Sequence, residues 1–156
     1  MVVSEIMRTD VVTCRPHMSL EQVIKTMLEH ECGFLPVVGM FGAVMGVITD
    51  RDVSAALAAR HRTPPHVTVE EAMKYPVYTC HRSDTLLTAL GAMSQHRVRR
   101  LPVVDDRNVL QGVLSMDDVV LASHKPGSAT SEDIVETLRV IYRRHSAELT
   151  AVSNGG

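Results

Sequence analysis

The chain has 156 residues, a formal net charge of −2 and 45% apolar residues. A domain of this length buries about 70% of the surface that its unfolded chain exposes, so it needs neither a disulfide nor a metal for stability. The slightly negative charge disfavours a general nucleic-acid binder. Three cysteines, an odd number, point to a reducing compartment, and we find neither a secretory signal nor an apolar run of membrane length. We therefore expect a cytoplasmic protein without membrane contact.

An internal duplication organises most of the chain. Shifting the sequence by 66 residues aligns positions 3–53 with 69–119 without a gap, and 17 of the 51 pairs are identical. Chance would give only a few matches, so the sequence predicts two copies of one structural unit. We assign residues 1–62 to the first copy and 63–124 to the second. Residues 125–156 are predicted to form a C-terminal helix from near Ser131 and a disordered tail from Ser153.

Each copy begins with the same predicted elements. A helical turn at 3–7 or 69–73 precedes a short extended segment at 11–13 or 77–79. An amphipathic helix follows, which starts at Ser19 in the first copy and near Asp84 in the second. Its start in the first copy is a capping box completed by Gln22. Its apolar positions recur at helical spacing and are Leu20, Val23, Ile24, Met27 and Leu28.

The second half of each copy predicts a strand, a tight turn, another strand and a helix. The strands are expected at 35–38 and 44–48 in the first copy, and at 101–104 and 109–114 in the second. The pattern per copy is β-α-β-β-α, which indicates an α/β protein of the α+β type. One copy is too small to cover its own sheet, so we expect the two pseudo-symmetric repeats to pack through their sheets.

The most informative motif occurs once in each copy, as Gly-Val-Ile-Thr-x-x-Asp at 46–52 and Gly-Val-Leu-Ser-x-x-Asp at 112–118. A hydroxyl residue, Thr49 or Ser115, precedes an acid, Asp52 or Asp118, by three positions at a predicted helix start. This spacing is typical of a capping box, and a helix cap alone explains the motif. The carboxylate can also accept hydrogen bonds from the two neighbouring hydroxyls of a ribose, and the two roles are compatible.

Basic residues near these motifs fit a phosphorylated ligand. A carboxylate repels phosphate, so a nucleotide at this position requires cationic partners. Arg51 and the cluster of Arg97, Arg99 and Arg100 can supply them through bidentate hydrogen bonds.

The duplicated pattern resembles a tandem pair of cystathionine-β-synthase-type (CBS) domains, also called a Bateman module. The first copy carries the resemblance in Met7-x5-Thr13, Leu35-Pro36-Val37-Val38 and Gly46-Val-Ile-Thr49-x-x-Asp52. The second copy carries it in Met73-x5-Thr79, the segment from His96 to Val104 and Gly112-Val-Leu-Ser115-x-x-Asp118. The resemblance covers roughly residues 3–123, and the ordered set of motifs, found twice, makes it specific.

The resemblance implies a non-enzymatic regulatory module that binds an adenosine-containing ligand in clefts between the two copies. AMP is the first choice, with ADP, ATP, NAD or S-adenosylmethionine as others, and no further cofactor is implied. In that family the Thr/Ser and Asp of the last motif contact ribose and phosphate. Backbone at the first strand reads the adenine edge, and residues before Leu-Pro-Val-Val reach phosphate. Together with Arg51, the implied ligand site comprises Val12, Thr13, Cys14, Thr49, Arg51, Asp52, Tyr78, Thr79, Cys80, Arg99, Arg100, Ser115 and Asp118.

The two copies differ in charge at one part of this implied site. Gly33-Phe34 in the first copy stands where the second has Arg99-Arg100. We therefore expect one cleft to bind a phosphorylated nucleotide well and the other to be weaker, empty or more apolar.

Other functions fit the sequence less well. The absence of a Cys-x-x-Cys pair disfavours a metal site, and the absence of a nucleophile elbow, a Walker A loop or a G-x-G-x-x-G loop disfavours an enzyme. The alternative is a structural dimerisation or interaction module that has lost ligand binding, with the apolar turn at 40–42 and the C-terminal helix as contact surfaces. In either case we expect a homodimer and a separate effector protein.

Overall fold

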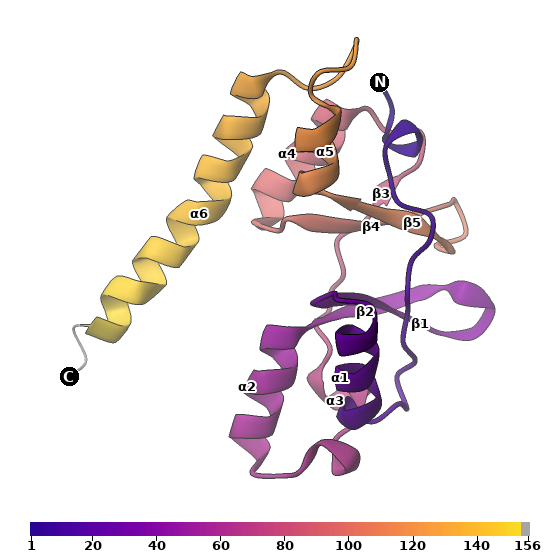
Figure 1. The fold of residues 1–156 in the computed structure, drawn as a ribbon, viewed down its shortest axis with the longest axis vertical. Helices are drawn as coiled ribbons and strands as arrows, with labels where there is room; N and C mark the ends of the chain where they lie inside the picture. Colours follow the sequence, from indigo (N-terminus) through magenta and orange to yellow (C-terminus); the bar gives the residue numbers. More distant parts are fainter. Residues whose placement is uncertain (154–156) are drawn as a thin grey trace. The chain divides into compact units, whose positions relative to one another are not determined.

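The computed structural model describes residues 1–153, apart from the side chains of Arg60 and of residues 144–153 (Figure 1). The predicted disordered tail lies outside the described residues, except for Ser153, which ends the helix α6 (Ser131–Ser153). Among the described helices, none combines the length and the apolar character that crossing a bilayer requires. The fold is of the mixed α+β class, as predicted, with small sheets and flanking helices.

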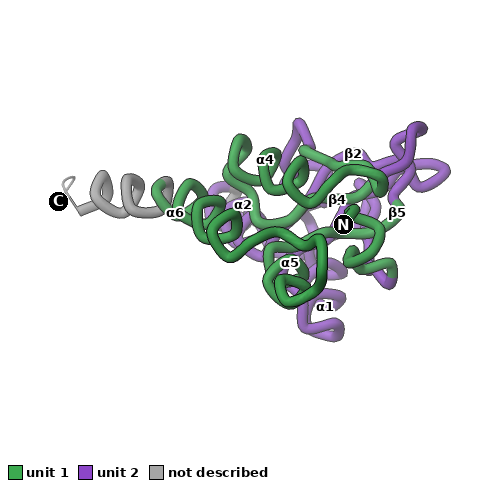
Figure 2. Tube along the Cα trace, turned by 90° about the horizontal axis from the view of Figure 1, so that it is seen from above, with its two compact units in different colours: residues 1–9, 78–103, 111–156 green, residues 10–77, 104–110 purple. Residues whose placement is uncertain are grey.

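The chain forms two compact units whose boundaries differ from those of the sequence repeats (Figure 2). Unit 1 comprises Met1–Thr9, Tyr78–Val103 and the chain from Gln111 onward. Unit 2 comprises Asp10–Val77 and Val104–Leu110. Unit 1 therefore contains most of the second repeat, the start of the first and the C-terminal helix, and unit 2 contains most of the first repeat with residues 63–77 and 104–110 of the second.

Unit 2 is built on a two-stranded antiparallel sheet. Strand β1 (Phe34–Val38) pairs with β2 (Val44–Thr49), and Leu35 lies opposite Ile48. Helices α1 (Leu20–Glu29), α2 (Asp50–Arg60) and α3 (Val69–Ala72) complete the unit. Its core consists of small and branched aliphatic residues with one methionine and one cysteine: Cys14, Leu20, Val23, Met27, Leu35, Val37, Ile48, Val53, Val67 and Val69.

Helix α1 confirms the predicted start and corrects the predicted apolar stripe. The Ser19 backbone N–H donates to Gln22 Oε1 at 2.9 Å, and the Gln22 N–H donates to Ser19 Oγ at 3.3 Å. Leu20, Val23 and Met27 are buried, but Leu28 is exposed. Ile24 is half-buried, so the buried face of α1 is narrower than the apolar stripe of the sequence and Leu28 lies at its exposed edge.

Unit 1 contains a three-stranded sheet in the order β3 (Cys80–His81), β4 (Arg100–Val104), β5 (Leu110–Ser115). Helix α4 (Leu86–His96) packs against α6, and the short α5 (Met116–Ala122) contacts α6 as well. A turn of 3-10 helix at Val3–Glu5 places Val3 in the core. The fully buried large side chains of this core are Leu86, Met93, Leu101 and Leu114.

Two boundaries differ from the sequence prediction. The segments at 11–13 and 77–79 are not strands; pairing begins later, at Cys14, which bridges to Val37, and at β3. Helix α4 begins at Leu86 with Thr85 as its cap, because the Asp84 carboxylate accepts the His81 N–H at 2.8 Å instead of capping the helix.

Candidate functional site: two buried carboxylates at helix starts

The first acid site lies in unit 2, where β2 ends and α2 begins. The Thr49 backbone N–H and the Thr49 hydroxyl both donate to Asp52 Oδ2, at 2.9 and 2.7 Å. In return, the Asp52 backbone N–H donates to Thr49 Oγ1 at 3.2 Å. The capping box predicted from the sequence is confirmed, and it holds the buried Asp52 carboxylate in one orientation.

The second acid site, in unit 1, repeats this geometry at the junction of β5 and α5. The Ser115 N–H and hydroxyl donate to Asp118 Oδ2 at 2.9 and 2.5 Å, and the Asp118 N–H donates to Ser115 Oγ at 3.2 Å. Here both the hydroxyl residue and the acid are buried. In both sites Oδ2 is committed to the cap, which leaves Oδ1 as the oxygen available to other partners.

A basic residue that the sequence analysis did not single out pairs with Oδ1 in each site. Arg8 Nε donates to Asp118 Oδ1 at 2.9 Å, and Lys74 Nζ lies 3.2 Å from Asp52 Oδ1. The hydrogen bond and the charge of Asp118 raise the pKa of Arg8 above its ordinary value. The 66-residue shift that reveals the duplication also pairs Arg8 with Lys74, so the signal was present in the sequence.

Each acid site therefore combines parts of both sequence repeats within one compact unit. The acid comes from one repeat, and its basic partner comes from the start of the other. Arg8 and Asp118 are 110 residues apart in the sequence. No local sequence motif connects two residues so far apart.

The glycine of each motif allows the segment carrying the basic residue to approach the strand. The Arg8 backbone exchanges hydrogen bonds with Val113, at 3.0 and 2.9 Å, and the Lys74 backbone does so with Val47, at 3.3 and 2.9 Å. A Cβ on Gly112 would lie 2.5 Å from the Arg8 carbonyl oxygen, and one on Gly46 would lie 2.9 Å from that of Lys74. A larger residue at either glycine would push the basic segment away from the acid.

Asp118 also lines a cavity of about 260 Å³ within unit 1. This volume lies just below the usual range of ligand pockets, which begins at roughly 300 Å³. The cavity walls come from the N-terminal segment and from α5 and the residues after it: Glu5, Ile6, Met7, Asp118, Leu121, Ala122 and Lys125. The buried carboxylate thus faces a hollow that contains both apolar surface and a lysine.

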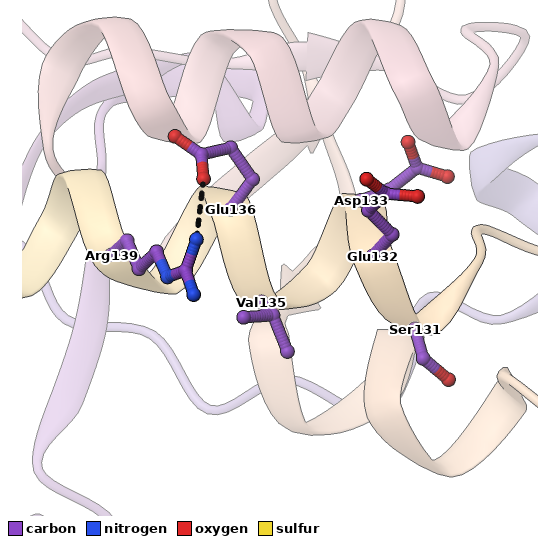
Figure 3. Close-up of a pocket in the computed structure, with 6 residues that line it drawn as sticks. All are labelled: Ser131, Glu132, Asp133, Val135, Glu136 and Arg139. Atoms are coloured by element: carbon purple, nitrogen blue, oxygen red, sulfur yellow. Dashed lines mark hydrogen bonds and ion pairs between the residues drawn. The ribbon is translucent and has the colours of Figure 1, made fainter.

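A larger hollow, about 710 Å³, lies along α6 and contains none of the predicted site residues. Figure 3 shows the side chains that line this hollow, all of which project from α6. Arg139 Nη1 lies 3.5 Å from Glu136 Oε2. Three carboxylates, those of Glu132, Asp133 and Glu136, face it. One arginine accompanies these three carboxylates, whereas the cavity beside Asp118 has two carboxylates and one lysine. The smaller cavity is the better candidate because it contains a predicted site residue.

The predicted phosphate-binding arginines occupy different environments. Arg99 is exposed, and its carbonyl oxygen accepts the Met116 N–H at 2.9 Å, which places it at the start of α5. Arg100 is half-buried at the start of β4. In unit 2 the equivalent backbone contact joins Gly33 O to the Asp50 N–H at 3.2 Å, and Arg51 is exposed in the first turn of α2. The structure thus brings the backbone of Arg99 to the helix start that carries Ser115 and Asp118, and Arg100 follows it as the first residue of β4.

The residues expected to read an adenine edge precede or begin the first paired segment of each unit. Val12 and Thr13 are half-buried beside the buried Cys14, whose N–H donates to Pro36 O at 3.1 Å. Burial raises the pKa of the Cys14 thiol to about 12. Cys14 is therefore a structural core residue, and its carbonyl oxygen is engaged as well, because it accepts the Val38 N–H at 2.9 Å.

The equivalent segment of unit 1 adds an aromatic pair. The Tyr78 ring stacks on His96, with 3.7 Å between ring centroids and 9° between planes. Thr79 is half-buried, and burial, with a contribution from the Asp84 charge, raises the pKa of Cys80 to about 12.

Among the residues that the structure describes, no group of three His, Cys, Asp or Glu side chains is placed to hold a metal ion.

Comparison with known proteins agrees with the repeat and the geometry. The family model described as "CBS domain" matches twice, at residues 3–59 and 69–125. The chain belongs to the CBS domain family. CBS domain-containing protein YhcV of Bacillus subtilis is 32% identical over 132 residues, which cover 83% of this chain and 90% of YhcV.

Solved structures of CBS domain pairs share the fold. The pair of protein MJ0100, in complex with 5′-methylthioadenosine and S-adenosyl-L-methionine, is 27% identical with a TM-score of 0.70, covering 78% of this chain and 94% of that one. CBSX2 in complex with AMP is 25% identical with a TM-score of 0.69, again covering 78% and 94%. These CBS-pair neighbours bind adenosine-containing ligands.

Some relatives are considerably longer than this chain. It spans 60% of protein MK0525 of Methanopyrus kandleri and 23% of inosine-5′-monophosphate dehydrogenase of Mycobacterium tuberculosis, at 30% and 34% identity. The likeness to these proteins therefore concerns a part of each of them.

Proposed function

We propose that this CBS pair is a non-enzymatic regulatory module that binds an adenine nucleotide, AMP first among them, and passes the binding event to an effector protein. The observation that carries the proposal is the buried, cap-oriented carboxylate of Asp118. Its Oδ1 atom remains outside the cap, and its side chain lines a cavity in unit 1. The adenosine-containing ligands of the neighbours MJ0100 and CBSX2 support this choice.

The chemistry of the site fits a ribose. A carboxylate whose orientation is fixed can accept hydrogen bonds from two adjacent hydroxyls, and hydrogen bonds to a charged group contribute about 1.5–3 kcal/mol each. The backbone of Thr79 and Cys80 supplies polar groups for the adenine edge in unit 1. Arg99 and Arg100 supply positive charge for phosphate. We expect the equivalent site at Asp52 to bind more weakly, because Gly33 and Phe34 replace the two arginines.

A thermal-shift panel tests this proposal. The panel contains AMP, ADP, ATP, NAD and S-adenosylmethionine, applied to the full chain. A ligand at a concentration 100 times its dissociation constant stabilises the folded protein by about 2.7 kcal/mol. This corresponds to a rise in Tm of roughly 5–10 °C for a chain of this size. We expect AMP to stabilise the protein and Asp118→Asn to remove most of the shift. Failure of every ligand to raise Tm would refute the proposal.

A second candidate function is that of a dimerisation or interaction module. The turn between β1 and β2 favours it, because Phe41 is 87% exposed at a positive φ of 57° and Met40 beside it is also exposed. Exposed apolar tips of this kind are found at protein–protein contacts. Sedimentation of the wild type and of Phe41→Ser distinguishes the two functions, since a loss of self-association without any nucleotide effect would favour the interaction module.

A further inference from the structure

We propose that Arg8 and Lys74 are displaceable counter-ions of the ribose-binding carboxylates, and that they make each site select nucleosides that carry an anionic group. This inference rests on the proposed function and adds the determinant of its specificity. Each basic residue pairs with Oδ1 of its acid. When ribose hydroxyls bind to Oδ1, the basic side chain turns to the ligand's phosphate.

The two members of each pair differ in their freedom to move. The side chain of Asp118 is 7% exposed and that of Asp52 is 5% exposed, and three cap hydrogen bonds hold each of them. The partner side chains of Arg8 and Lys74 are 67% and 71% exposed. A ligand can therefore displace the basic group far more easily than it can reorient the acid.

The backbone of each basic residue is fixed although its side chain is exposed. Arg8 and Lys74 exchange backbone hydrogen bonds with Val113 and Val47, next to the motif glycines. Displacement therefore moves only the long flexible side chain, whose charged end stays within reach of the acid. The released charge remains beside the bound sugar.

The charge balance of this exchange predicts selectivity. A buried carboxylate without a partner is costly, so the basic residue satisfies it while the site is empty. When a neutral nucleoside binds to Oδ1, the displaced cation gains no anionic partner. AMP takes Oδ1 through its hydroxyls and offers its phosphate to the same cation, so the ion pair is replaced by another one.

The occurrence of this pair in both units supports a common role. The two pairs are related by the same 66-residue shift as the acids and the glycines. They differ in that Arg8 makes a directional Nε–H hydrogen bond of 2.9 Å, whereas Lys74 contributes an ammonium group at 3.2 Å. Substitution in both units therefore gives the clearest test.

Titration calorimetry with AMP and adenosine provides that test. The ratio of the adenosine to the AMP dissociation constant is measured for the wild type, Arg8→Gln, Lys74→Gln and the double variant. We expect the double variant to lower this ratio about 10-fold without weakening adenosine. Arg8→Lys and Lys74→Arg, which keep the charge, are expected to retain the wild-type ratio. An unchanged ratio in the double variant, with AMP still bound, would overturn this inference and leave the proposed function standing; a wild type that binds neither compound would overturn both.

An NMR measurement on the wild type covers the case in which the glutamine variants do not fold. The Nε–H resonance of Arg8, assigned by its loss in Arg8→Lys, reports the bond to Asp118 directly. We expect AMP and adenosine both to shift it, and only AMP to leave the proton protected from exchange with water. A resonance that neither compound moves, under conditions where AMP binds, would contradict displacement.

Discussion

Asp118 in unit 1 and Asp52 in unit 2 have the same capping box and an equivalent basic partner, but their surroundings differ. Unit 1 adds Arg99 and Arg100 at the helix start, where unit 2 has Gly33 and Phe34. Its acid also lines a cavity, and its chain carries the stacked Tyr78 and His96. The hydroxyl residue is buried in unit 1 and half-buried in unit 2.

This comparison separates what the fold requires from what a ligand requires. The capping box satisfies backbone N–H groups at a helix start and would be retained without any ligand. The glycines and the paired basic segments are likewise shared by both units. Arg99 and Arg100, by contrast, are present only in unit 1, just before and at the start of β4, and no fold requirement common to the two units explains them. We therefore expect unit 1 to hold the tighter nucleotide site.

Asp118→Asn alters the acid of the site that we expect to bind AMP more tightly. Loss of the charge weakens two hydrogen bonds to ribose, for which we expect AMP affinity to fall about 100-fold, or roughly 2.7 kcal/mol. Asp52→Asn should change the AMP affinity of this tighter site by no more than a factor of about 3. Calorimetry with AMP measures both. Asp117→Asn, which alters an exposed acid in the same helical turn, is the matched control, and an equal loss in that variant would refute a specific role for Asp118.

Alanine substitutions at the motif glycines compare the two close backbone approaches. The added Cβ meets the Arg8 carbonyl oxygen at 2.5 Å in Gly112→Ala and the Lys74 carbonyl oxygen at 2.9 Å in Gly46→Ala. We expect losses of unfolding free energy of about 2–3 kcal/mol and about 1–2 kcal/mol, respectively. Chemical denaturation measures them.

Gly91→Ala is the control for the glycine series. This glycine lies inside α4, and a Cβ there would meet nothing within 4 Å. Removing a glycine from a helix interior should stabilise by about 0.5–1 kcal/mol. A greater loss at Gly46 than at Gly112 would show that the two approaches are not ordered as the structure has them.

The double substitution Arg99→Gly/Arg100→Phe gives unit 1 the residues of unit 2. Without these charges AMP should bind about 10-fold more weakly, or roughly 1.4 kcal/mol, while adenosine is unaffected. Arg97→Gly removes a neighbouring charge at a position where φ is 54°, which glycine accepts, and should change AMP affinity less than 2-fold. If Arg97→Gly weakens AMP as much as the double substitution does, general surface charge and not the helix start sets the affinity.

Cys14 and Cys80 occupy equivalent positions, so the two units should behave alike at these cysteines. Burial raises the pKa of both Cys14 and Cys80 to about 12, so neither should react with iodoacetamide at pH 8, whereas the half-exposed Cys32 should. Because the folded state disfavours the thiolate, stability should fall as the pH rises above 9.0, the ordinary value, toward 12. Mass spectrometry of the native alkylated protein checks the first point, and denaturation at pH 8 and 10 checks the second. Rapid labelling of Cys14 or Cys80 would show that its unit opens readily.

The parts of this molecule that were predictable from sequence are those with local causes. The capping boxes at Thr49 and Ser115 depend on side chains three residues apart, and the duplication fixes the order of elements. The residues at which strand pairing begins, Cys14 and Cys80, were not predicted. A few apolar residues do not distinguish a paired strand from an extended segment that precedes it.

The basic partners were not predicted because their cause is not local. Arg8 meets Asp118 across 110 residues, and an isolated arginine near a methionine has no recognisable motif. Only the equivalence of Arg8 and Lys74 under the 66-residue shift could have identified them. In a duplicated sequence, functional residues can therefore also be sought at equivalent positions where the two residues differ in type but have the same charge.

A crystal structure of the full chain grown with AMP would show whether the Asp118 carboxylate binds the ribose. We predict that both ribose hydroxyls lie within about 2.7–3.1 Å of the Asp118 carboxylate, with the phosphate near Arg99 and Arg100. A nucleotide bound elsewhere, with Asp118 Oδ1 still paired to Arg8 and distant from any sugar, would contradict the account.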